Sequence, residues 1–425
     1  MSQKTVLTGI TTTGTPHIGN YLGAIKPAIE ASRNPAFKSY FFLADFHALI
    51  KCHEPDRVAA STREIAATWL AMGLDPEQAV FYRQTDIPEI TELTWILTCL
   101  TSKGLMNRAH AYKASVDQNR EAGKEDLDDG VLMGLFNYPI LMAADILMFN
   151  ADIIPVGKDQ IQHIEMARDI AGRFNFQYQP LFTLPEAQVD EETKLIPGLD
   201  GRKMSKSYNN TIPLFSDRDT LRSLIFQIRT DLRQPGEPKD PDDSTLFQLY
   251  RCFANEQETA AMRQRFLEGI AWGDAKQELF EYLDAQLTDP RERYNELMND
   301  LGHVETVLKR GAEKARAYAS PLLEKARIAV GIRPLTYVST EQVEVQKKKE
   351  KSAEELERIE QGRLRAVMIQ IQPLLDQVKQ STDPAAQARK VLAEKQAEVE
   401  GAKKKVRDKL QNELDLLQQS LQAYL

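Results

Sequence analysis

Two short segments of the 425-residue chain bring together residue types that suit phosphate binding. The first, Gly14-Thr15-Pro16-His17-Ile18-Gly19-Asn20, follows a short β-rich run and opens a stretch with helical periodicity. A helix N-terminus at this point would present free N–H groups and partial positive charge to an anion. Gly19 would let the backbone approach a ligand closely, and His17 could donate a hydrogen bond to phosphate oxygens as charge develops.

The second segment, Lys203-Met204-Ser205-Lys206-Ser207, follows a glycine-containing turn at residues 197–201. Two lysines three positions apart, with a hydroxyl between them, could close over a triphosphate and neutralise a departing pyrophosphate. Taken alone, each segment also has a purely structural interpretation. The first could be an ordinary strand–turn–helix connection, and the second a solvated basic loop.

Together, the two segments resemble the paired signature motifs of the class I aminoacyl-tRNA synthetases. Residues 203–207 match the second motif letter for letter, and His17-Ile18-Gly19-Asn20 keeps the His-Ile-Gly of the first. The resemblance implies that His17, Lys203 and Lys206 stabilise charge while an amino acid carboxylate attacks the α-phosphate of ATP. ATP would enter as its Mg²⁺ complex, with no covalent enzyme intermediate, no permanently bound cofactor and no metal site on the protein.

Residues 138–147 (YPILMAADIL) and 156–163 (VGKDQIQH) resemble the specificity helix and the next segment of the tryptophanyl branch of that family. In that branch, the carboxylate at the position of Asp145 accepts the indole N–H. Indole can only donate, so a buried acceptor rejects phenylalanine, which would leave the acceptor unpaired. Such a site can reach roughly 10⁴–10⁵ of discrimination without editing. The alternative, a surface or capping carboxylate, fits poorly with a position inside an apolar helix.

The same resemblance supplies the remaining site predictions. Gln160 would hold the substrate ammonium or carboxylate, and Asp159 and Gly157 would contact the ribose and adenine side of ATP. His47 would line the tryptophan pocket, although it could equally be a satisfied core histidine. The predicted tryptophan-binding residues are Leu7, His47, Tyr138, Met142, Asp145, Ile154 and Gln160. The predicted ATP-binding residues are Thr11, His17, Gly19, Asn20, Gly157, Asp159, Lys203, Met204, Ser205 and Lys206.

The sequence departs from the family pattern at three places near the site. Thr11-Thr12-Thr13-Gly14 stands where many relatives have Gln-Pro-Ser-Gly, so Thr11 replaces a glutamine that usually contacts substrate. Ala111 and Ser115 stand where bacterial relatives often place Gln and Lys, and Tyr208-Asn209-Asn210 replaces the commoner Asp-Pro-Asn. We interpret these changes as the mark of a divergent subgroup with altered loop contacts and retained activity.

The elements that must position these residues alternate between strand and helix. Residues 5–7, 39–43, 79–82 and 153–156 are β-rich, whereas residues 18–32 and 56–72 have helical patterns. This alternation predicts an α/β fold with a Rossmann-like doubly wound parallel sheet, whose ligands bind beyond the carboxyl ends of the strands. Residues 1–215 would form the catalytic domain. Residues 216–335 have few β-rich runs and predict an all-α domain, which reads the anticodon in this family.

Residues 336–425 predict a separate helical extension that the resemblance does not cover. Ser381-Thr382-Asp383-Pro384 divides it into two arms, with Asp383 as an N-cap and Pro384 in the first helical position. We therefore expect an antiparallel helical hairpin; the alternative is a solvated, partly frayed tail. Lys403, Lys404, Lys405 and Arg407 could touch tRNA or form a solvated face. The apolar positions with helical spacing are Val367, Ile371, Leu375, Val378, Val399, Val406, Leu410, Leu414, Leu417 and Leu421.

The composition of the chain limits the class of protein and the cellular compartment that fit it. The net charge of −8 argues against a protein that coats nucleic acid non-specifically, without excluding a tRNA partner. The three cysteines form no CxxC pair, which argues against a zinc or disulfide framework and favours a reducing cytoplasm. The N-terminus lacks the features of a signal peptide. Residues 130–149 are apolar but contain Asn137 and Asp145, which predicts a buried helix in place of a membrane span.

The resemblance thus implies L-tryptophan, ATP and tRNA(Trp) as substrates of a cytoplasmic homodimer that does not bind membranes. Three alternatives remain at this point. A tyrosyl enzyme would usually carry KFGKS or KFGKT in its lysine loop, and a small nucleotidyltransferase would carry an HxGH-type motif without the helical domain. An inactive paralogue could act as an RNA-binding or scaffold protein through its tail.

Overall fold

The computed structural model describes residues 3–189, 196–335, 353–402 and 404–425, with some side chains between 353 and 408 left undescribed. The chain divides into two compact units, Met1–Arg333 and Pro334–Leu425. Over the described residues, no helix combines the length and apolar character needed to cross a membrane. The separation of residues 1–215 from residues 216–335 stays a prediction, because both lie within the first unit.

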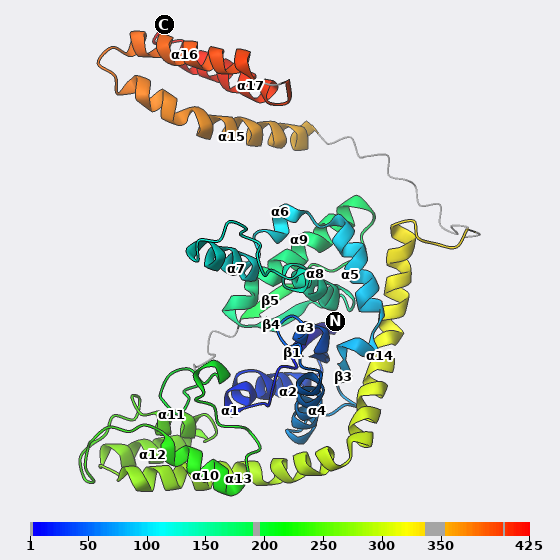
Figure 1. Ribbon diagram of the computed structural model, residues 1–425, viewed down its shortest axis with the longest axis vertical. Coiled ribbons are helices and arrows are strands. Elements are labelled where there is room, and N and C mark those ends of the chain that lie inside the picture. Colours follow the sequence, from blue (N-terminus) through cyan, green and yellow to red (C-terminus); the bar gives the residue numbers. More distant parts are fainter. Residues whose placement is uncertain (1–2, 190–195, 336–352, 403) are drawn as a thin grey trace. The chain divides into compact units, whose positions relative to one another are not determined.

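The first unit is built on a five-stranded parallel sheet in the order β3-β2-β1-β4-β5 (Figure 1). The central strand β1 pairs with β2 on one side and with β4 on the other, so the strand order reverses there, as in doubly wound folds. The Rossmann-like fold prediction is confirmed. Sequence patterns missed β5 because its EAQV segment is short and no position in it is fully buried. The strands are β1 (Lys4–Thr11), β2 (Phe37–Ala44), β3 (Val80–Arg83), β4 (Ile153–Val156) and β5 (Glu186–Val189).

Helices cover both faces of the sheet, and the side chains of β2 alternate between them. Tyr40 and Phe42 belong to the core shared with α5 (Glu89–Leu100), α8 (Met133–Leu147) and α9 (Ile161–Gln177). Phe41 and Leu43 pack on the opposite face against α2 (Lys26–Ser32) and α4 (Pro55–Ala71). This period of two is what a strand buried on both faces requires. Shorter elements are α3 (Asp45–Ala48), η2 (Gln84–Asp86), α6 (Lys103–Met106), α7 (His110–Glu121), η3 (Lys158–Gln160) and η4 (Lys206–Tyr208).

The predicted helix at residues 18–32 is present, but it contains a π-helical segment. It consists of α1 (Ile18–Asn20), the π segment η1 (Tyr21–Ile25) and α2. The N–H of Lys26 donates to the carbonyl of Tyr21, five residues back, in place of the usual four. Pro27 follows directly and has no N–H to continue the regular ladder, which accounts for the local widening.

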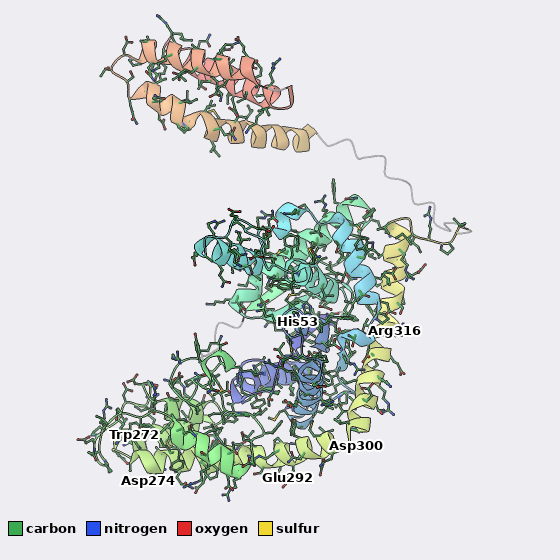
Figure 2. The ribbon with its side chains drawn as sticks, viewed as in Figure 1. His53, Trp272, Asp274, Glu292, Asp300 and Arg316 are labelled. Atoms are coloured by element: carbon green, nitrogen blue, oxygen red, sulfur yellow. The ribbon has the colours of Figure 1, made fainter. Side chains whose placement is uncertain are left out.

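The chain beyond the second motif is helical, as expected. Residues from α10 to α13 share a core that also takes in Ile18 from the first motif and Met204 from the second. Asp300 begins α14 by accepting the His303 N–H at 3.0 Å, at the junction with α13 shown in Figure 2. Further along α14, Arg316 bonds Glu89 of α5 at 3.0 Å, so α14 ties the helical region to the sheet. The helices are α10 (Arg218–Gln227), α11 (Thr245–Arg251), α12 (Glu256–Leu267), α13 (Trp272–Asn299) and α14 (Leu301–Ala329).

The described residues of the second unit form three helices, so the predicted two-armed hairpin is wrong in its second arm. α15 (Ala353–Lys379) ends before the predicted break, and Asp383 caps α16 (Pro384–Gly401) by accepting the Ala386 N–H at 3.0 Å. The backbone turns extended at Ala402, directly after Gly401, and α17 (Lys404–Leu421) follows. Glycine weakens a helix, which explains a break at this point. Ile371, Leu375, Val378, Val391, Leu417 and Leu421 form the shared core.

Two parts of the tail predictions lie outside the described residues. Residues 336–352, with which the predicted extension begins, are among them, and so is Lys403. The side chains of Lys404 and Lys405 are not described either, so the proposed contact of this basic run with tRNA stays a prediction.

Replacement of Gly311 by alanine should strongly destabilise the first unit. A Cβ atom at Gly311 would collide with the backbone carbonyl of Phe81 in β3, so helix and strand would have to move apart. We expect Gly311→Ala to lower the free energy of unfolding by about 3 kcal/mol, measured by urea denaturation. Gly302→Ala in the same helix is the matched control, because its nearest neighbour is the Asp300 carboxylate at 3.5 Å. Equal stability of the two variants would contradict this close helix–strand packing.

Candidate active site

A cavity of about 540 Å³ opens at the carboxyl ends of β1 and β4, where the strand order reverses. Ligands of doubly wound sheets bind at this place. All the predicted tryptophan-binding residues line this cavity: Leu7, His47, Tyr138, Met142, Asp145, Ile154 and Gln160. Thr11 and Gly157 of the ATP-binding prediction also line it, as does Ala111, one of the departures from the family pattern.

Asp145 lies in the wall of this cavity with only 1% of its surface exposed. It comes from α8, where its sequence neighbours Ala144 and Ile146 are buried. Burial raises the pKa of its carboxyl, while hydrogen bonds from His47 and Gln84 act in the opposite direction. His47 Nε2 lies 2.8 Å from Oδ2, and Gln84 Nε2 lies 2.8 and 2.9 Å from the two carboxylate oxygens. The carboxylate is therefore a satisfied buried group, not a surface or capping residue.

Gln84 is a site residue that the sequence analysis missed. It is completely buried in η2, directly after β3, and its Oε1 accepts the backbone N–H of Phe46 at 3.1 Å. A usable signal was present in the sequence. A polar residue directly after an apolar strand lies at the carboxyl end of the sheet, where the ligands of this fold bind.

His163 was also missed, and it links three predicted residues in one chain of hydrogen bonds. Gln160 Nε2 donates to Asp159 at 2.8 Å. The other end of the amide, Gln160 Oε1, therefore accepts a hydrogen bond from His163 Nδ1, also at 2.8 Å. His163 Nε2 then accepts the hydroxyl of Tyr138 at 2.8 Å. Burial lowers the pKa of His163, which favours this neutral form. The spacing of three between Gln160 and His163 could have indicated the pair.

The first motif forms a tightly bonded helix start. His17 is the N-cap of α1: its Nδ1 accepts the Asn20 N–H at 3.3 Å, and Asn20 Oδ1 accepts the His17 N–H at 3.1 Å. A Cβ atom at Gly19 would lie 3.0 Å from the His17 ring, so the glycine lets the ring pack against the turn. Backbone bonds from Ile18 to Ile212 and from Leu214 to Pro16 join this turn to the segment after the second motif.

The second motif rests on the first. The sulfur of Met204 accepts the Gly19 N–H at 3.3 Å, and Met204 is buried in the core of the helical region. Asn210 holds the loop: its side chain accepts the Ser205 N–H at 2.8 Å and donates to Asp200 at 2.7 Å and to the Lys203 carbonyl at 3.1 Å. The bond from Asn210 is also the main cause that lowers the pKa of Asp200 to about 2. Of the Tyr208-Asn209-Asn210 segment, the last residue thus fixes the loop.

A second cavity, of about 350 Å³, brings His17 and Lys206 together. Gly14, Thr15 and Arg57 also line it, and a Cβ atom at Gly14 would lie 2.8 Å from Lys206 Nζ. Burial lowers the pKa of Lys206, and the charge of Arg57 adds to this effect. The pKa of His17 is lowered to about 4, mainly by burial and to a smaller extent by the charge of Lys206. Glu64 also lines this cavity, but the charges of Lys206 and Arg57 outnumber it and suit an anionic ligand.

The remaining predicted residues lie outside both cavities. Gly19, Asn20, Met204 and Ser205 take part in the contacts within and between the two motifs. Asp159 is exposed and bonds Gln160 at the rim of the first cavity. Lys203 is exposed and lines neither cavity, so the structure brings Lys206 to His17 but does not bring Lys203 with it.

Comparison with known proteins gives a consistent family. Residues 2–288 match the model of the family described as tRNA synthetases class I (W and Y). The tryptophan–tRNA ligase of Neisseria meningitidis is 60% identical over 335 residues, which cover 79% of this chain and 100% of that protein. The enzyme of the same name from Pseudomonas putida is 59% identical over 351 residues, covering 82% of this chain and 78% of that protein.

A solved structure agrees with these relatives. The tryptophanyl-tRNA synthetase of Campylobacter jejuni, determined in complex with ADP and tryptophan, is 40% identical and superposes with a TM-score of 0.71. The match covers 77% of this chain and 99% of that one. With the two signature motifs in contact and a carboxylate buried in the wall of the adjoining cavity, the chain belongs to the tryptophan–tRNA ligases of the class I tRNA synthetase family.

Proposed function

We propose that this chain activates L-tryptophan with ATP, releasing pyrophosphate, and then transfers the tryptophanyl group to tRNA(Trp). The observation that carries the proposal is the first cavity, in which one buried carboxylate, that of Asp145, is surrounded by apolar groups such as Leu7, Met142 and Ile154. An indole ring would bury its faces against these side chains and donate its N–H to Asp145. A ligand without that donor would leave the carboxylate with an unfilled acceptor site.

The proposed reaction takes place between substrates bound in the two cavities. Tryptophan in the first cavity would present its carboxylate toward the second, where Lys206 and His17 face the phosphates of ATP. In-line attack on the α-phosphate forms the mixed anhydride and breaks the bond to pyrophosphate. A ribose hydroxyl of the terminal tRNA nucleotide then attacks the anhydride. The chain contributes positioning and charge stabilisation, and Mg²⁺ belongs to the ATP complex as part of the substrate.

His17 is suited to act as a neutral hydrogen-bond donor in this reaction. Its Nδ1 is occupied as the acceptor of the Asn20 N–H, so the ring proton resides on Nε2. With its pKa lowered to about 4, the ring stays neutral at physiological pH. It can therefore bond a phosphate oxygen as charge develops without adding a second full charge beside Lys206.

The assignment of regions to tRNA binding is part of the same proposal. Residues 1–215 would carry out the chemistry, and the helices of residues 216–335 would bind the anticodon part of tRNA(Trp), as the resemblance implies. A cytoplasmic location is supported by the spacing of the three cysteines, Cys52, Cys99 and Cys252, which form no CxxC pair.

We further propose that the chain acts as a homodimer through an apolar face beside the tryptophan cavity. Trp95 of α5 is 68% exposed, and Met133 at the start of α8 is 66% exposed. Between these helices, Leu49, Leu141 and Tyr138 line a shallow cavity of about 320 Å³. Large apolar groups gathered on one face are typical of a protein–protein contact, and Tyr138 connects this face to the tryptophan cavity.

Amino-acid-dependent exchange of pyrophosphate into ATP tests the proposed function. The wild-type protein should catalyse exchange with tryptophan and not with tyrosine or phenylalanine. Lys206→Ala should lower the exchange rate roughly 100-fold, because a charge-stabilising donor is lost from the second cavity, where the phosphates of ATP would bind. Tryptophan binding, measured by calorimetry, should be unchanged, since Lys206 does not line the first cavity. Lys309→Ala, an exposed lysine on α14, is the matched control. An inactive wild-type protein would favour a binding or scaffold role instead.

The protonation of His17 can be measured directly by NMR. We expect its imidazole to titrate near pH 4, with His17→Gln used to assign the resonance. The folded-state pKa lies below the ordinary value of 6.5, so the unfolded chain binds more protons between these two pH values. The contribution of His17 to the free energy of unfolding must therefore fall as the pH drops from 6.5 to 4. A midpoint near 6.5 would show that the ring is not buried as described.

Trp95→Glu tests the proposed dimer. A charge placed at the centre of an apolar contact should weaken association at least about 100-fold, since aromatic residues dominate such contacts. Sedimentation velocity would report the change from dimer to monomer. Phe176→Glu is the matched control, because Phe176 is 93% exposed on α9 and does not line the shallow cavity. Dimers that persist in Trp95→Glu, or a wild-type monomer, would refute this interface.

A further inference from the structure

Gln84 connects the backbone of one loop to the carboxylate in the wall of the tryptophan cavity. Its side chain lies between α3 and α8 and is 0% exposed. Oε1 accepts the N–H of Phe46 at 3.1 Å, which fixes the orientation of the amide. The amide nitrogen must then face Asp145, and it lies 2.8 Å from Oδ1 and 2.9 Å from Oδ2. A backbone N–H thus determines which group is offered to the carboxylate.

The bonds around Asp145 leave one acceptor site. An ionised carboxylate has about four lone-pair positions on its two oxygens. Gln84 takes one on each oxygen, and His47 Nε2 takes a second on Oδ2, where it can only donate. The unused position is therefore on Oδ1. Asp145 lines the tryptophan cavity, and no further donor to Oδ1 is found among the described residues.

We propose that Gln84 is a positioning residue for tryptophan specificity, which holds Asp145 in place as an acceptor with a single open position for the indole N–H. This inference rests on the proposed function. It assigns to Gln84 no contact with the substrate, since Gln84 acts only through Asp145. Without the amide donor, the buried carboxylate would rotate or take up a proton, and a protonated oxygen would offer a donor where indole also has one.

A purely structural role for Gln84 makes a different prediction. Loss of packing or of stability would affect every amino acid substrate alike. Loss of the oriented acceptor would affect only a substrate that has an N–H to donate. β-(3-Benzothienyl)alanine distinguishes the two, because sulfur replaces the indole N–H in a ring of nearly the same shape.

The experiment compares kcat/KM in pyrophosphate exchange for tryptophan and for benzothienylalanine. We expect Gln84→Met to lower the tryptophan value roughly 10- to 100-fold, the range for a hydrogen bond to a charged group, and to leave the benzothienylalanine value within about twofold. The KM for ATP should not change. The preference for tryptophan would thus collapse in this variant.

Two further variants keep the test decisive. Ser39→Ala is the matched control: its buried hydroxyl has no hydrogen-bond partner in the described chain, and its loss should leave the preference intact. Gln84→Glu retains an acceptor for the Phe46 N–H but places a second carboxylate beside Asp145, and such a pair shares one proton. Its tryptophan preference should be poor at high pH and improve as the pH falls. This variant carries the same comparison if Gln84→Met fails to fold.

The outcomes separate this inference from the function on which it rests. If the wild-type protein shows no tryptophan-dependent exchange, the proposed function fails. If the wild type is active and Gln84→Met lowers kcat/KM equally for tryptophan and for benzothienylalanine, Gln84 has a structural role and the inference is overturned. An unchanged preference in both Gln84 variants would overturn it as well.

Discussion

Asp145 is a carboxylate placed inside an apolar helix, and its burial determines much of the surrounding structure. Burial of an ionised group is costly unless donors surround it, so the fold must bring hydrogen bonds to this point from distant parts of the chain. His47 comes from α3, directly after β2, and Gln84 comes from η2, directly after β3, at the ends of these two loop connections. Because the strands are parallel, both loops lie at the same edge of the sheet. The parallel topology is thus what allows a polar group to be stable in the wall of an apolar cavity.

The two signature motifs are held together by a core that takes one residue from each of them. Ile18 and Met204 are buried with residues of α10, α11 and α13, and the Met204 sulfur accepts the Gly19 N–H. The same core therefore anchors both motifs to the helical region. This arrangement connects the part of the chain proposed to bind the anticodon directly to the motifs that line the cavity of His17 and Lys206. The connection consists of packed side chains and not of a flexible loop.

The sequence predicted features that depend on local pattern or on short motifs. Four of the five strands, the helix starting at Ile18 and the cap at Asp383 follow from periodicity and from turn chemistry. Features that depend on tertiary contacts were missed. β5 has no apolar run, since its partner β4 and not its own composition makes it a strand. Gln84 and His163 are ordinary polar residues until the fold brings them to Asp145 and Tyr138. The break at Ala402 depends on a single glycine inside an otherwise continuous helical pattern.

Residues 11–14, one of the three places at which the sequence departs from the family pattern, lie at the junction of the two cavities. Thr11 and Thr13 line the tryptophan cavity, whereas Gly14 and Thr15, the next residues, line the cavity that contains Lys206. The backbone of Gly14 has a φ of 144°, and a side chain there would meet Lys206, so this position needs glycine. Asp145 and its donors His47 and Gln84 come from α8, α3 and η2, so changes at residues 11–13 leave the hydrogen bonds around this carboxylate in place.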